Sequence, residues 1–147
     1  MEELIKMLHE TDCSLVVRTA QGDVSSYNKK GVRDLIWLLD NHPERLQRAW
    51  IADKVIGKAA AGLLVNGKVE RVYAEVMSRL ALPLLDAAGI PYCYGQLVSR
   101  IVIPEGDMRC PLEQIVADAS TAQETEDLLR KHFAERQAAM KEHLLTT

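Results

Sequence analysis

Two lysines four residues apart, Lys54 and Lys58, are the side chains whose type and spacing most suggest chemistry in this sequence. On a helix that begins after Asp53, both lysines and Gly57 lie along one face, so the two ammonium groups become neighbours. Like charges at this spacing destabilise a helix, and cations in its first turn oppose the helix dipole. We therefore expect an anion against them, either Asp53, Glu75 or a bound phosphate or carboxylate. Two lysines extended into water from an exposed helix edge are the alternative.

A second pair of candidate residues follows the next predicted strand, with Glu75 near its carboxyl end and Ser78 at the following helix start. Ligands of open α/β sheets bind beyond the carboxyl ends of the strands, so both side chains could reach the cavity that holds Lys58. A carboxylate that faces a lysine can anchor a ligand or move a proton. The alternative is a structural ion pair together with an ordinary helix cap.

Cys110 begins a third pattern, the sequence Cys110-Pro111-Leu112-Glu113. A proline just inside the start and a glutamate three residues after the cap are typical of a helix N-terminus, which favours a capping role. The functional alternative is a reactive thiol at that helix start. The four histidines do not fall at metal-ligand spacing, and we expect neither a metal site nor a bound cofactor.

The composition predicts a single globular chain without a membrane or nucleic-acid partner. Of its 147 residues, 48% are hydrophobic and 27% are charged, close to the averages for globular proteins. A net charge of -3 and an aromatic share of 5% argue against nucleic-acid binding, which needs a basic face or stacking aromatics. No apolar run approaches the roughly 20 residues that span a bilayer. Three cysteines without a disulfide spacing favour the reducing cytoplasm.

Hydrophobic periodicity predicts helices and strands that alternate from Ala49 onward. Helices are expected around Leu4 and Leu8, then at 31–40, 55–65, 78–88 and 121–145. Strands are expected at 14–19, 23–27, 49–52, 69–76, 92–94 and 100–103. Alternation of strands and helices predicts parallel strands, and the early hairpin makes the sheet mixed. The expected class is therefore α/β, with a charged C-terminal helix that begins at a capping box from Thr121 to Glu124.

Four motifs in the same order resemble a bacterial and archaeal family, the domain of unknown function 1893. They are WIADKVIGKAAA at 50–61, VYAEVMS at 72–78, YGQLV at 94–98 and CPLE at 110–113. That family is assigned to the cytidine deaminase-like fold, so the resemblance implies a three-layer α/β/α domain over residues 1–118. Residues 119–147 lie outside the resemblance and are expected to form a helical tail, with a possible role in a homo-oligomer.

The resemblance does not imply deamination, because every zinc ligand of such enzymes is missing here. Zinc deaminases carry a His or Cys with a Glu at the first helix start and a Pro-Cys-x-x-Cys at the second. This chain carries Lys54, Gly57 and Lys58 at the first and Val76 to Leu80 at the second. A site with cations in place of a metal is expected to be zinc-independent and to bind an anionic small molecule, such as a nucleotide or another phosphate compound.

The expected ligand-binding residues of that site are Asp53, Lys54, Gly57, Lys58, Glu75 and Ser78. Two other functions remain open. The chain is either a catalytically inert interaction or oligomerisation module, or a metal-free enzyme that uses a pocket lysine as base or Schiff-base nucleophile. Candidate catalytic residues for the enzyme are Lys58, Glu75 and Cys110.

Overall fold

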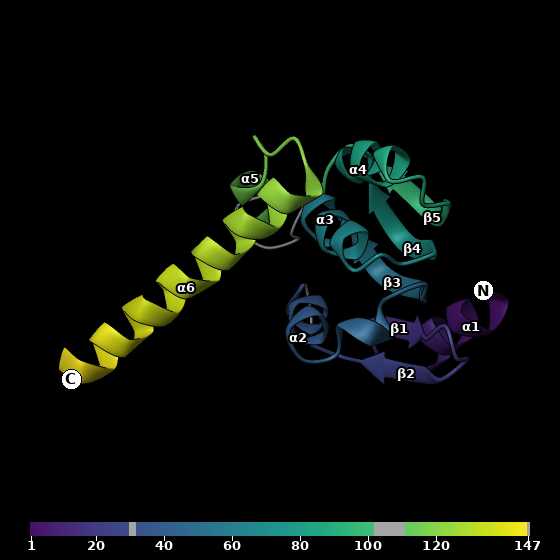
Figure 1. Ribbon diagram of the computed structural model, residues 1–147, viewed down its shortest axis with the longest axis horizontal. Coiled ribbons are helices and arrows are strands. Elements are labelled where there is room, and N and C mark those ends of the chain that lie inside the picture. The colour runs from purple at the N-terminus through teal and green to yellow at the C-terminus, as the bar shows by residue number, and fades with distance from the viewer. Residues whose placement is uncertain (30–31, 102–110, 147) are drawn as a thin grey trace.

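The strands form one mixed five-stranded sheet in the order β2-β1-β3-β4-β5. This is seen in a computed structural model that describes residues 1–29, 32–101 and 111–146 (Figure 1). The strands are β1 (Leu15–Arg18), β2 (Val24–Tyr27), β3 (Trp50–Ile56), β4 (Arg71–Ser78) and β5 (Tyr92–Val98). β1 pairs antiparallel with β2 and β3, whereas β3, β4 and β5 run parallel. The predicted α/β class and mixed sheet are confirmed.

Helix α1 (Glu2–Glu10) covers one face of the sheet. Leu4 and Leu8 lie one helical turn apart and are buried against Val16 of β1 and Ala52 of β3. This spacing places both leucines on one side of the helix, which is why a short charged segment folds onto the sheet. The predicted first helix is confirmed.

Three helices cover the opposite face, namely α2 (Arg33–Asn41), α3 (Lys58–Asn66) and α4 (Leu82–Ala87). Their buried side chains, such as Leu35 and Leu63, pack with Ile51 of β3 and Val72 of β4 in the larger core. With α1 on the other side of the sheet, the domain has three layers. A 3-10 helix, η1 (Pro43–Arg45), leads from α2 toward β3.

The boundary between β3 and α3 differs from the prediction. The helix was expected from residue 55, but β3 continues to Ile56 and α3 begins at Lys58. The extension arises because Asp53 pairs with Leu15 of β1 and Ala74 of β4, and the strand then continues to pair with β4 as far as Ile56. Hydrogen bonds to strands on both sides are a tertiary effect that overrides local helix propensity.

The turn after β4 begins as predicted at Ser78, whose hydroxyl accepts a hydrogen bond from Leu80 N at 3.2 Å. It caps a 3-10 helix, η2 (Arg79–Ala81), which continues into α4. Pro83 was expected to kink one long helix. It lies instead in the first turn of α4, where its missing N–H breaks no helical hydrogen bond.

Two predicted strands near the end of the sheet also change. The strand expected at 92–94 continues to Val98, because β5 pairs with β4 as far as Ser78. The strand expected at 100–103 is not formed at Arg100 and Ile101, and its remaining residues lie outside the described part of the chain.

The long helix α6 (Ala122–Thr146) packs its first turns on α3. Its predicted cap is present, since Glu124 N donates to Thr121 Oγ1 at 3.1 Å. Leu129 is fully buried in the larger core, which also contains Val116 and Ala119. The core thus continues across the boundary placed at residue 118, and a division into two parts at that residue stays a prediction. The outer half of α6 extends away from the sheet (Figure 1).

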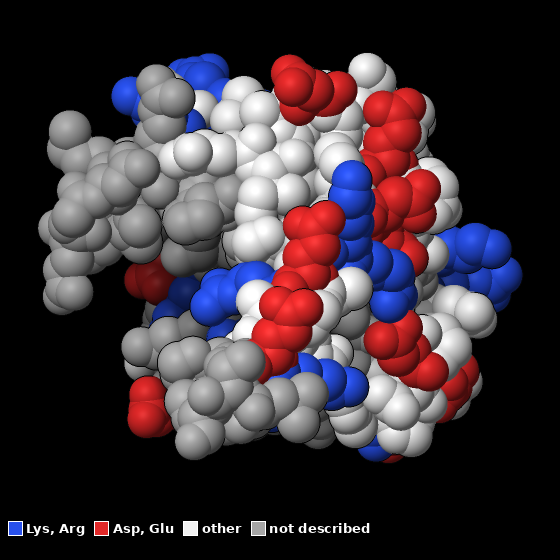
Figure 2. Space-filling model, turned by 90° about the vertical axis from the view of Figure 1, so that its left-hand side faces the viewer, with Lys and Arg blue, Asp and Glu red and all other residues white. Residues whose placement is uncertain are grey.

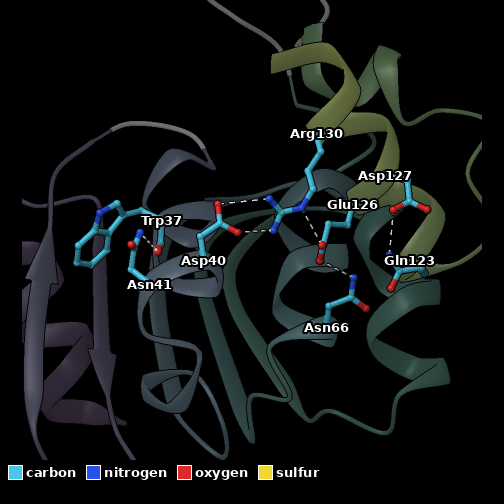
Figure 3. A network of polar contacts seen from close by, with 8 residues as sticks. All are labelled: Trp37, Asp40, Asn41, Asn66, Gln123, Glu126, Asp127 and Arg130. Carbon is cyan, nitrogen blue, oxygen red and sulfur yellow. Dashed lines mark hydrogen bonds and ion pairs between the residues drawn. The ribbon is translucent and has the colours of Figure 1, made fainter. Parts of the chain in front are cut away.

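Arg130 of α6 joins three helices (Figure 3). Its guanidinium contacts Asp40 of α2 at 2.8 Å and Glu126 of α6 at 2.9 Å. Asn66, the last residue of α3, donates to the same Glu126 carboxylate at 2.9 Å. Because these contacts are partly exposed, they add little to the free energy of unfolding, but they fix the orientation of α6 relative to α2 and α3.

The contact between α3 and α6 requires a glycine. A Cβ atom at Gly62 would lie 2.6 Å from Cγ2 of Thr125, which is fully buried. We expect Gly62→Ala to lower the free energy of unfolding by about 1 kcal/mol, because overpacking costs about 1–3 kcal/mol and exceeds the gain of about 1 kcal/mol in helix propensity. Urea unfolding measures the change. Combining it with Thr125→Ser removes the opposing methyl group and should restore part of the lost stability, since Cβ of residue 125 stays 2.8 Å from the added atom. A single variant more stable than the parent would contradict this packing.

The side of the molecule toward which α6 extends carries charges of both signs, with Lys and Arg set among Asp and Glu (Figure 2). Among the residues that Figure 2 draws in colour, no wide surface of one sign is visible on that side. Among the described residues, no helix combines the length and the apolar character needed to cross a bilayer.

Candidate functional site

A cavity of about 310 Å³ lies at the carboxyl end of β3, where the chain turns into α3. The loop before β1, the end of β2, the start of α2 and α5 (Pro111–Ile115) complete its wall. Its apolar lining consists of Cys13, Val32, Val55, Ala59, Ala60, Ile101 and Leu112. The other lining residues are Asp12, Ser14, Asn28, Asp53, Lys54, Gly57 and Glu113. The cavity lies where the parallel strands led us to expect a ligand.

Asp53 is the buried acid of this cavity, with only 7% of its surface exposed. Its Oδ1 accepts a hydrogen bond from Val55 N at 3.2 Å. Burial raises its pKa to about 7, since the backbone N–H groups of Val55 and Lys54 offset only part of the desolvation and the Asp34 carboxylate opposes ionisation. Asp53 therefore changes its charge near neutral pH.

Glu113 caps α3 from a distant part of the chain. Its Oε1 accepts from Lys58 N at 3.3 Å, and its Oε2 accepts from Ile101 N at 2.8 Å. A Cβ at Gly57 would lie 2.7 Å from Oε1, so glycine permits this approach. The positive end of α3 thus already faces a carboxylate of the protein itself.

The two lysines do not lie on one helix face. Lys54 is in β3 and lines the cavity, whereas Lys58 is the first residue of α3. The ammonium group of Lys58 donates to the carbonyl oxygen of Ala117 at 3.0 Å, and Lys58 is absent from the cavity lining. The expected placement of both lysines on one helix face is wrong, because it required a helix that begins directly after Asp53.

Glu75 and Ser78 lie outside the cavity lining. Glu75, in the middle of β4, is exposed and lies 3.7 Å from Nε2 of His9 in α1, on the face of the sheet away from α3. Ser78 is fully buried and is used as the cap of η2. Of the six expected binding residues, the structure brings Asp53, Lys54 and Gly57 together in one cavity. Cys110 lies outside the described residues.

The described residues contain no group of three or more His, Cys, Asp or Glu side chains that could hold a metal ion. Cys13, which is buried, and Cys93, which is exposed, are free thiols. Cys13 Sγ lies 3.0 Å from Oγ1 of Thr11.

Sequence reasoning did not find Cys13, Asn28, Val32 or Ile101 as cavity residues, because they come from loops that only the folded chain brings together. The sequence pattern predicts that Glu113 caps the start of its own helix. Its real contacts lie 55 and 12 residues away in the sequence. The pattern correctly indicates that Glu113 caps a helix, but the helix that it caps is α3 and not its own.

Comparison with known proteins gives the fold and the family. A crystal structure of a DUF1893 family protein from Thermotoga maritima superimposes with a TM-score of 0.77 and 23% sequence identity, over 91% of this chain and 88% of that one. At this identity the likeness shows a shared fold alone. No curated protein matches. The family model described as Domain of unknown function (DUF1893) matches residues 3–133, beyond the limit of 118 expected from the motifs, and the chain therefore belongs to this family.

Proposed function

We propose that this protein binds a small molecule in the cavity at the end of β3. The bound molecule donates a hydrogen bond to Asp53 or places a positive charge next to it. The observation that carries the proposal is a buried carboxyl group in the wall of a largely apolar cavity of about 310 Å³. Ligand pockets commonly have volumes of about 300–1,000 Å³, an apolar lining and a few polar groups that orient the ligand. The size suits a single small molecule.

The charges around the cavity favour a neutral or cationic ligand. Among the described residues, Asp12, Asp53 and Glu113 line it, against one basic residue, Lys54. Glu113 is already occupied by two backbone donors, whereas the described residues place no side-chain donor on Asp53. An uncompensated buried carboxyl group gains most from a donor or a cation. A pKa of about 7 at Asp53 makes binding of a cation stronger above neutral pH.

The anionic ligand expected from the sequence has less support at this position. The start of α3, which would attract a phosphate, faces Glu113, and only Lys54 of the two lysines lines the cavity. A nucleotide bound through Lys54 stays a prediction. A Schiff-base role for Lys58 has little support, because its ammonium group is held by Ala117.

We also propose that the domain is of the cytidine deaminase-like type implied by the motifs. The three layers, the mixed sheet and the cavity at the start of α3 support this assignment. The site residues described above do not supply zinc ligands, so the proposed binding is independent of zinc.

Native mass spectrometry of freshly purified protein, followed by a thermal-shift screen of cationic, neutral and anionic small molecules at pH 6 and pH 8, tests the proposed ligand class. Cationic or neutral donors are expected to raise the melting temperature, since ligand at 100 times its Kd stabilises by about 2.7 kcal/mol. A cationic ligand should bind Asp53→Asn about tenfold more weakly, because it loses a charge-assisted hydrogen bond.

Asp12→Asn is the matched control, since Asp12 is an exposed carboxylate of the same cavity. It should weaken the binding of a cationic ligand less than Asp53→Asn does, because water screens the charge of an exposed carboxylate. Stabilisation by anions alone, strengthened in Asp53→Asn, would contradict the proposal and support the anionic ligand. No stabilisation by any class would support the inert module.

A further inference from the structure

A second cavity, of about 270 Å³, lies at the amino end of β3, at the other end of the strand from Asp53. Its wall combines the hairpin turn between β1 and β2, residues 19–22, with Arg18, Arg48, Trp50 and Glu70. Unlike the first cavity, it has two arginines and one glutamate among its lining residues.

An aromatic ring and two arginines lie in register across three neighbouring strands. Arg18 of β1 pairs with Trp50 of β3, which pairs with Arg71 of β4. The guanidinium carbons lie 5.3 Å and 5.1 Å from the centre of the Trp50 ring, for Arg18 and Arg71 respectively. Contact with the ring orients both cations at this end of the sheet.

Glu70 does not neutralise these arginines. Its Oε2 accepts a hydrogen bond of 2.6 Å from Nε1 of Trp50, which holds the indole in place. In the described part of the chain, no carboxylate lies within ion-pair distance of Arg18, Arg48 or Arg71. The three positive charges gathered here therefore have no acidic partner among those residues.

The backbone of Arg48 adopts an uncommon conformation at this cavity. Its φ is 59°, and its N–H donates to Lys68 O at 2.8 Å. Lys68 has a φ of 61°, and these two basic residues are the non-glycine residues with positive φ in the described chain. Such conformations persist only where the surrounding structure enforces them, and they are enriched at functional sites.

From these observations we infer that this second cavity binds the phosphate group of a small molecule. Guanidinium groups bind phosphate oxygens through two parallel hydrogen bonds, and a phosphate between Arg18 and Arg48 would balance the charges that the described residues leave unpaired. The walls of the cavity favour a small molecule over a nucleic acid, whose binding requires an extended basic face that a chain of net charge -3 lacks.

Tryptophan fluorescence offers a direct test, because the chain has two tryptophans and Trp37→Phe leaves Trp50 as the sole one. Inorganic phosphate, pyrophosphate and a nucleoside monophosphate are titrated at constant ionic strength, with sodium chloride as the reference. Saturable quenching of Trp50 is expected. Inorganic phosphate and the monophosphate distinguish free phosphate from phosphate carried by an organic group. Calorimetric titration of the unaltered chain gives an independent affinity.

Arg18→Gln and Arg48→Gln should each weaken binding about tenfold, since each removes a charge-assisted contact. Arg136→Gln, which removes the same charge from the exposed outer half of α6, is the matched control and should leave the affinity unchanged. Quenching that matches sodium chloride, no heat of binding, or equal weakening by all three substitutions would overturn the inference.

Discussion

Glu113→Ala is expected to lower the free energy of unfolding by about 2–4 kcal/mol, because it leaves two part-buried backbone donors without their acceptor, at about 1–3 kcal/mol each. Those donors are Lys58 N, at the start of α3, and Ile101 N. The side chain is only 6% exposed, so water does not replace the carboxylate freely. The start of α3 also loses the anion that opposes its dipole. Urea unfolding at pH 7 measures the loss, and hydrogen exchange at the Lys58 amide should become faster.

Glu113→Gln is the matched variant for this effect. Its amide oxygen can accept from one of the two donors, while its NH₂ group opposes the other. We expect a destabilisation between the parent and Glu113→Ala. Unchanged stability of the alanine variant, with normal exchange at Lys58, would show that α3 does not depend on this cap.

Asp53→Asn is expected to be more stable than the parent at pH 8, by a margin that grows as the pH rises. The folded-state pKa of Asp53 is raised from 3.8 to about 7, so its contribution to stability is fully present below pH 3.8 and is lost as the pH rises through 7. Asparagine stays neutral and keeps an oxygen for the N–H of Val55. Between pH 5 and pH 8 the gap should widen on the order of 2–3 kcal/mol, since one pKa unit corresponds to about 1.4 kcal/mol.

Urea unfolding of both proteins at several values between pH 5 and pH 8.5 measures this gap. Asp12→Asn serves as the comparison and should stay within about 0.5 kcal/mol of the parent throughout, as surface substitutions usually do. A gap for Asp53→Asn that does not change with pH would mean that the carboxyl group is not desolvated in the folded protein.

Helix α1 and the end of β3 show which parts of the fold can be predicted from the sequence and which cannot. The elements set by local pattern, such as α1 with Leu4 and Leu8, agree with the structure. The end of β3 does not, because Asp53 and Val55 follow the pairing of β3 with its neighbouring strands, which no local window contains. Tertiary contacts overrode a sequence that locally resembles a helix start.

The candidate site was predictable in position but not in composition. Parallel strands with helices between them placed a cavity at the carboxyl end of β3, and Asp53, Lys54 and Gly57 do lie there. The role of Glu113 was beyond prediction, because it joins residues 55 positions apart in the sequence. Because β3 continues to Ile56, Lys58 is the first residue of α3, and its ammonium group donates to the carbonyl oxygen of Ala117.

The packing of α6 on the core ends close to the limit of the family match. Among the described hydrophobic side chains of α6, Phe133 is the last that packs against the larger core, and the family match ends at the same residue. From residue 134 to residue 142 the side chains are mostly exposed, so helical turns there add length without adding to the interior of the domain. The described turns after Phe133 therefore contribute little to the buried core of the domain, whose packing and family match both end near this residue.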